Sequence, residues 1–194
     1  MPLKKDPSER STLDEHGIIF LSGEIDGGRA DSVCEKIIEI NVGRDVDQIQ
    51  LLINSPGGHC SAGFAIIDLM DWSRLPIYTT GIGMVASMAL AIFMAGQKGH
   101  RVLTPRTSVL SHRFSAMSFG NHSELVARRK EEDLLHQRLL DHYQAHTNLK
   151  SADEVTDRLL LEVDTWLSPA EAVEFGIADT IQTDRKSIVP NEAA

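Results

Sequence analysis

The segment around Ser87 combines a nucleophilic side chain with unusually small neighbours. Ser87 follows Gly83 and Ala86 at a point where an apolar strand ends and an apolar helix is predicted to begin. Small residues let the backbone approach a substrate closely, and the N–H groups at a helix start favour developing negative charge. Serine hydrolases need such a nucleophile together with a base, an orienting group and N–H donors for the oxyanion. Taken alone, a serine in a tight turn is more often structural than catalytic.

Two further features fit the same chemistry. Gly57 and Gly58 follow a predicted strand, and paired glycines free two backbone N–H groups to form an oxyanion hole. His112 follows another apolar strand, 25 residues after Ser87, where a histidine can act as general base. The histidines of the charged stretch 122–147 are expected to be solvated instead. Because ligand sites of parallel sheets gather at the carboxyl ends of strands, we expect these features to lie close together.

The elements that position these residues alternate along the chain. Short β-branched runs predict strands at 17–21, 49–53, 77–81, 101–103 and 109–110, and apolar periodicity predicts helices at 27–41, 62–75 and 87–95. Strands that alternate with helices predict an α/β fold with a mostly parallel sheet and helical crossovers.

A long charged helix is predicted at 122–147. Asn121 with Glu124 three residues later is typical of a helix N-terminus, and Ser151 and Ser168 begin two further capping patterns. The leucines of the long helix need burial, either by oligomerisation or by packing within the chain.

Composition limits the classes of function. The 194 residues carry a formal net charge of −9, which argues against nucleic acid as a partner because phosphate binding needs clustered lysine and arginine. Cys34 and Cys60 show no metal-ligand spacing, so no metal site is expected. No signal peptide is apparent, and the most apolar stretch, 83–96, is shorter than the ~20 residues that span a bilayer. We therefore expect a cytoplasmic protein with no membrane contact.

Four motifs in order give a specific resemblance. They are 53–58 (INSPGG), 81–89 (GIGMVASMA), 111–112 (SH) and 166–176 (WLSPAEAVEFG). Together they resemble the proteolytic subunit of the Clp protease, ClpP, over roughly residues 17–182. The resemblance implies the ClpP/crotonase-like fold, with stacked, mostly parallel strands and the helix at about 122–147 as a projecting handle. It also implies Ser87 as nucleophile, His112 as base, and the N–H groups of Gly58 and Met88 as the oxyanion hole.

The same resemblance implies how the protein works with others. A flexible arm (1–16), one peptidase domain (17–182) and a C-terminal tail (183–194) would assemble into two stacked heptameric rings. An AAA+ unfoldase ring of the ClpX, ClpA or ClpC type would feed unfolded protein substrates into the chamber, which releases short peptides. The subunit would need no cofactor, since ATP is used by the unfoldase.

Three departures from the family pattern stand out. The family acid is expected six residues before Trp166, where this chain has Leu160. We favour Asp157 as the third member of the triad, with a gap in the segment 148–165. Glu162 and Asp164 remain alternatives, although Asp164 matches a second, non-catalytic acid of the family. Arg113-Phe114 replace the usual Gln-Pro after the histidine, and the region before residue 17 is shorter than the family's axial loop.

Two other hypotheses remain open. Without an acid that reaches His112, the chain would be a weak, regulatory or purely structural ring subunit. A crotonase-type acyl-CoA hydratase or isomerase has a similar fold and also uses paired N–H donors, but it would leave Ser87 and His112 without a role.

Overall fold

The structure is a computed structural model that describes residues 13–43, 45–115 and 117–183. Its elements are η1 (Leu13–His16), β1 (Ile18–Ser22), α1 (Gly27–Gly43), β2 (Ile49–Ser55), α2 (Cys60–Trp72), β3 (Ile77–Ala86), α3 (Met88–Met94), β4 (Arg101–Leu103), β5 (Ser108–Ser111), α4 (His122–His146), α5 (Ala152–Arg158), β6 (Thr165–Leu167), α6 (Pro169–Glu174) and β7 (Thr180–Ile181). The predicted α/β fold with a mostly parallel sheet and helical crossovers is confirmed.

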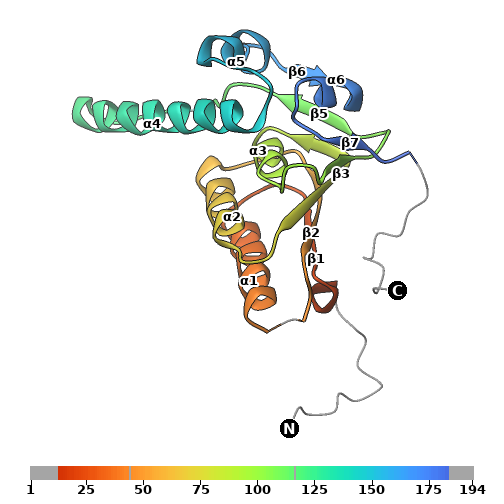
Figure 1. Cartoon of the computed structure of the whole chain (residues 1–194). Coiled ribbons are helices and arrows are strands. Elements are labelled where there is room, and N and C mark those ends of the chain that lie inside the picture. Colours follow the sequence, from red (N-terminus) through yellow and green to blue (C-terminus); the bar gives the residue numbers. More distant parts are fainter. Residues whose placement is uncertain (1–12, 44, 116, 184–194) are drawn as a thin grey trace.

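One sheet organises the molecule. Strands β1, β2, β3, β4 and β7 lie side by side in that order and pair in parallel. Strand β5 pairs in parallel with the far end of β3, and β6 pairs antiparallel with β5. Helices α1, α2 and α3 cover one face of the sheet, while α5 and α6 lie near β5 and β6 (Figure 1).

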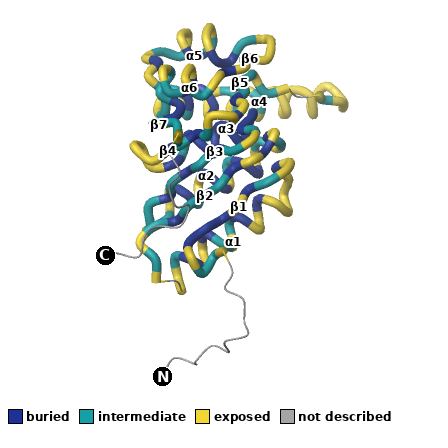
Figure 2. Tube along the Cα trace, turned by 90° about the vertical axis from the view of Figure 1, so that its right-hand side faces the viewer, coloured by how far each residue is buried: buried dark blue, intermediate teal, exposed yellow. Residues whose placement is uncertain are grey.

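The core between sheet and helices is aliphatic. Most of its fully buried side chains are isoleucine and leucine, with Phe93 the largest of them. Alternate residues of β2 face this core, because successive side chains of a strand point to opposite faces. Figure 2 shows the buried tube concentrated along the strands and the helices behind them.

Strand β3 is longer than predicted, and this matters for the site. The sequence predicts its end at Gly81, whereas the strand continues to Ala86. Its first half pairs with β2 and β4, and its second half pairs with β5. Gly81 interrupts the apolar run, so the sequence pattern predicts a strand end there. The strand in fact continues and exchanges β4 for β5 as its pairing partner. The extension carries the strand directly to Ser87.

Helix α4 has two different halves. Leu139, Leu140 and Tyr143 are buried against the body, while Leu125 and Leu134 in the projecting half are exposed (Figure 1). The predicted cap is present, since Asn121 and Glu124 form reciprocal hydrogen bonds. Packing within the chain therefore accounts for only the C-terminal half of the helix.

The predicted arm and tail fall partly outside the described residues. Positions 1–12 and 184–194 lie there, whereas 13–16 form η1 against β1. The domain boundaries remain a prediction. Within the described residues, none of the helices has the length and apolar character needed to cross a membrane.

Candidate active site

Ser87 lies in a strained turn between β3 and α3. Its φ of 55° and ψ of −125° make it the one non-glycine residue with positive φ in the described part of the chain. Such a conformation costs of order 1–3 kcal/mol and is typical of functional sites. The turn is held because the Ser87 N–H donates to the Leu110 carbonyl at 2.9 Å. A sharp strand-to-helix turn of this kind exposes the serine hydroxyl at the edge of the sheet.

His112 reaches Ser87 directly. Its Nε2 lies 2.7 Å from Ser87 Oγ, a hydrogen-bonding distance. Strand pairing accounts for the contact: Ala86 is opposite Leu110, so Ser87, one residue further on, and His112, two residues further on, leave the two strands at the same edge. The two side chains that sequence spacing singled out are thus brought together, in the arrangement that lets a base take the serine proton.

The acid nearest to His112 is Asp164. Asp164 Oδ1 lies 3.6 Å from His112 Nδ1, longer than a hydrogen bond, and its side chain is 57% exposed. The antiparallel pairing of β5 with β6 ends at Ser111 opposite Thr165. One step further, the same register sets His112 opposite Asp164.

Asp157, the acid favoured from the sequence, lies elsewhere. It is exposed on α5 and makes no hydrogen bond or ion pair with any residue in the described ranges. Leu160, six residues before Trp166, is 1% exposed and belongs to the core. The sequence named Asp164 only as an alternative, because its proximity to His112 follows from the β5–β6 register.

Gly57 and Gly58 lie against the nucleophile. A Cβ on Gly57 would come within 2.7 Å of Ser87 Cβ and 2.9 Å of the Met88 nitrogen. Gly58 forms a parallel bridge with Ile25. In this bridge the Ile25 N–H donates to the Gly57 carbonyl, and the His59 N–H donates to the Ile25 carbonyl. The N–H of Gly58 therefore points away from Ile25, and neither it nor the Met88 N–H donates to an acceptor among the described residues. Two free donors beside a serine are what an oxyanion hole requires.

A buried hydroxyl pair supports the strand that carries His112. Ser111 Oγ donates to the Leu159 carbonyl at 2.6 Å and lies 2.9 Å from Tyr143 Oη. Burial raises the pKa of Tyr143 to about 12, so its hydroxyl keeps its proton and can donate it to Ser111. These bonds join β5, α4 and the chain after α5 next to the site.

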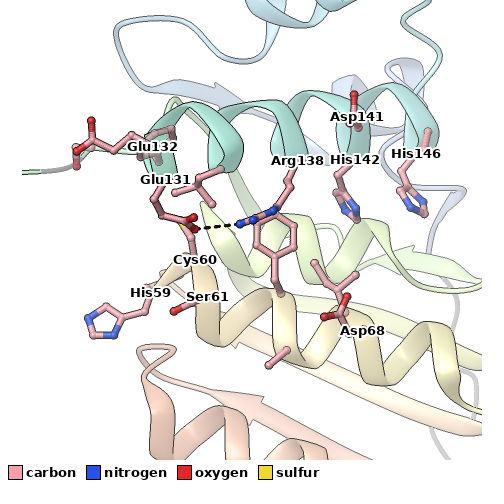
Figure 3. A pocket seen from close by; sticks show the side chains of 18 residues that line it. His59, Cys60, Ser61, Asp68, Glu131, Glu132, Arg138, Asp141, His142 and His146 are labelled. Carbon is pink, nitrogen blue, oxygen red and sulfur yellow. Dashed lines mark hydrogen bonds and ion pairs between the residues drawn. The ribbon is translucent and has the colours of Figure 1, made fainter. Parts of the chain in front are cut away.

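A groove extends from the site between α2 and α4. Its volume is about 1060 Å³, and it begins at Gly58 and Phe114. Figure 3 shows His142 and His146 on the face of α4 that lines the groove, and Arg138 paired with Glu131 at 3.1 Å. Gly58 is the residue that this groove shares with the candidate oxyanion hole, whereas Ser87 and His112 lie outside its lining.

Two partly buried groups in this region are not reactive partners of the serine. Burial, followed by the nearby His146, lowers the pKa of His142 to about 4, and its Nε2 bonds the Ala91 carbonyl of α3 at 2.8 Å. Burial raises the pKa of the Cys60 thiol, which disfavours the nucleophilic thiolate. The expectation that His142 is solvated was wrong, because the helix turns this face toward α3. No metal-binding cluster occurs within the ranges that the structure describes.

Two comparisons with known proteins agree. The family model described as Clp protease matches residues 5–185. The ATP-dependent Clp protease proteolytic subunit of Deinococcus radiodurans is 33% identical over 171 residues, which cover 88% of this chain and 82% of that protein.

Proposed function

The chain belongs to the Clp protease family and is a serine-type peptidase, and from this premise we propose that Ser87 and His112 cut peptide bonds inside a ring-shaped chamber. The observation that carries the proposal is the 2.7 Å contact between His112 Nε2 and Ser87 Oγ at a strained strand-to-helix turn. The unfolded polypeptide substrate, the rings and the unfoldase partner are part of this proposal.

The proposed reaction proceeds through an acyl-enzyme on Ser87. His112 Nε2 takes the hydroxyl proton while Ser87 Oγ attacks the peptide carbonyl carbon. The carbonyl oxygen becomes negative and accepts hydrogen bonds from the Gly58 and Met88 N–H groups. The tetrahedral species collapses, His112 gives its proton to the leaving amine, and an acyl-enzyme ester on Ser87 remains. Water, activated by the same histidine, hydrolyses that ester.

We propose Asp164 as the third member in place of Asp157. A carboxylate near Nδ1 orients the imidazole so that Nε2 faces the serine, and it stabilises the imidazolium that forms during attack. The 3.6 Å distance and the register of β5 with β6 support Asp164, whereas the exposure of Asp157 on α5 gives it no route to His112. The reaction as written needs no cofactor, and ATP would be used by the unfoldase.

Assembly is the other half of the proposal. The family implies oligomers that work with Clp ATPases, and we propose two stacked heptameric rings joined through the projecting half of α4. Exposed apolar residues on that half, Leu125, Val126 and Leu134, support an interface with a second copy. Enclosure in such a chamber would keep an unspecific peptidase away from folded proteins.

A weakly active or regulatory ring subunit is the second candidate. It is favoured by the long, exposed contact of Asp164 with His112. The crotonase-type alternative gives the Ser87–His112 contact no role, and both comparisons are with Clp proteases.

Hydrolysis assays on the assembled protein test the proposal. A short fluorogenic peptide reaches the chamber by diffusion, whereas an unfolded protein such as casein reports the gated activity. We expect the wild type to cleave the peptide alone and to degrade casein faster with an AAA+ unfoldase and ATP, and Ser87→Ala to do neither. An assembled wild type that is as inactive as Ser87→Ala would support the regulatory candidate instead.

A further inference from the structure

We propose that Arg113 is a positioning residue that clamps the loop at 160–164 and thereby holds Asp164 beside His112. The inference rests on the proposed function, since it assigns a role in the same reaction.

The clamp consists of two contacts from one guanidinium group. Arg113 Nε donates to the Leu160 carbonyl oxygen at 2.6 Å, and Nη1 lies 3.9 Å from a carboxylate oxygen of Glu162. The first is a short charge-assisted hydrogen bond. The second joins side chains that are 41% and 88% exposed, so it adds little. The Nε bond to the backbone is therefore the part that fixes the loop.

His112 and Arg113, two consecutive residues after β5, thus contact both the nucleophile and the loop that carries Asp164. His112 faces Ser87 through Nε2 and Asp164 through Nδ1, while Arg113 reaches back to Leu160 at the start of the same loop. The loop is hydrogen-bonded to Arg113 at its beginning and lies near His112 at its end. A displacement of Leu160 would move the chain that carries Asp164.

The loop has few other restraints. It is anchored at Leu160, whose side chain is buried, and at Thr165, where the pairing with β5 begins. Between these two residues, Val163 is 68% exposed and Asp164 57% exposed. Within the part of the chain that the structure describes, Arg113 and His112 supply its only hydrogen bonds and ion pairs between 161 and 164. A short exposed loop of this kind loses its geometry when a single bond is removed.

A positioning role differs measurably from a substrate contact. The charge on His112 develops only as the serine is attacked, so Asp164 acts on the transition state and its displacement lowers kcat. An arginine that binds substrate would instead raise KM when it is removed. Because Arg113 acts through Asp164, its removal should cost nothing further once Asp164 is already neutral.

The kinetic test uses peptide hydrolysis by assembled Arg113→Ala, Arg113→Lys, Asp164→Asn and the double variant Arg113→Ala/Asp164→Asn. Arg106→Ala, on the exposed turn between β4 and β5, is the matched control. We expect Arg113→Ala to lower kcat about tenfold with KM within about twofold, by the loss of the Asp164 contact. The lysine variant should recover part of kcat, and the double variant should be no slower than Asp164→Asn. A raised KM, an additive loss, or a kcat equal to that of Arg106→Ala would overturn the proposal.

Hydrogen exchange separates this inference from the proposed function. The amides of Leu159 and Leu160, which both donate to the Val155 carbonyl, should exchange faster in Arg113→Ala than in the wild type and Arg106→Ala, whether or not the protein cleaves peptides. If the wild type shows no Ser87-dependent hydrolysis, the proposed function fails, and unchanged exchange in Arg113→Ala would overturn the clamp independently.

Discussion

Replacement of Asp164 by asparagine tests how the triad is completed. The substitution removes the charge and keeps the shape, so the attraction to the imidazolium of His112 is lost while the ring keeps a polar neighbour. The attraction exists only while His112 is charged, during attack and collapse. We therefore expect a lower kcat and a nearly unchanged KM.

The size of the effect follows from the geometry. Two unit charges at 3.6 Å attract by about 1 kcal/mol at the dielectric constant of water and by about 5 kcal/mol at an effective constant of 20. The Asp164 side chain is 57% exposed, so solvent screens the pair and the lower part of this range applies. A loss of about 1 to 2 kcal/mol corresponds to an about fivefold to thirtyfold lower kcat. This is far less than the ~10⁴-fold loss known for a buried triad aspartate.

The assay is steady-state hydrolysis of a short fluorogenic peptide by assembled protein, with Asp157→Asn as the matched control. Asp157→Asn should keep the kcat of the wild type, because that carboxylate is exposed on α5 and has no bond to the site. Full activity of Asp164→Asn, or an equal loss in Asp157→Asn, would refute the register argument that selects Asp164.

Two further predictions concern the turn and the helix packing. Gly57→Ala should lower kcat by about 10²-fold or more, because its φ is 92° and the new Cβ would lie 2.6 Å from the Ala86 carbonyl oxygen and 2.9 Å from the Met88 nitrogen, which displaces a proposed oxyanion donor. Gly27→Ala, which meets no atom within 4 Å, should retain activity in the same peptide assay, and equal activity of both variants would contradict the close approach. Acidification should destabilise the packing of α4 on α3: the folded-state pKa of His142 is about 4 against 6.5 when unfolded, so the unfolded chain takes up the proton first and stability falls as pH drops from about 6.5 to 4. Between pH 7 and pH 5 the loss should be about 2 kcal/mol in denaturant titrations. His142→Gln should show a shallower pH dependence, and an equally steep one would show that another group is responsible.

The sequence predicted those parts of the fold that depend on local pattern. Alternation of apolar runs and glycine turns was sufficient for the α/β class, and the Asn121 and Ser168 caps appear as reciprocal hydrogen bonds. Ser151 accepts a hydrogen bond from the Glu154 N–H as predicted. The Glu154 carboxylate, however, accepts from the Lys150 N–H and not from the Ser151 N–H. Capping depends on three or four neighbouring residues, which explains why it is readable from sequence.

Features set by strand pairing were less accessible. The end of β3 was predicted five residues early, because Gly81 interrupts the apolar run although the strand continues with β5 as its new partner. The same limitation led to Asp157 as the favoured acid. Counting residues along the chain measures distance in sequence, whereas the antiparallel register of β5 and β6 decides which residue faces His112.

Fluorophosphonate labelling with site identification by mass spectrometry tests the central claim most directly. The reagent forms an adduct only with an activated serine. We predict a single adduct at Ser87 in the assembled wild type, none in Ser87→Ala, and strongly slowed labelling in His112→Gln. An assembled wild type that stays unlabelled, or that is labelled at another serine, would contradict the assignment of Ser87 as the nucleophile.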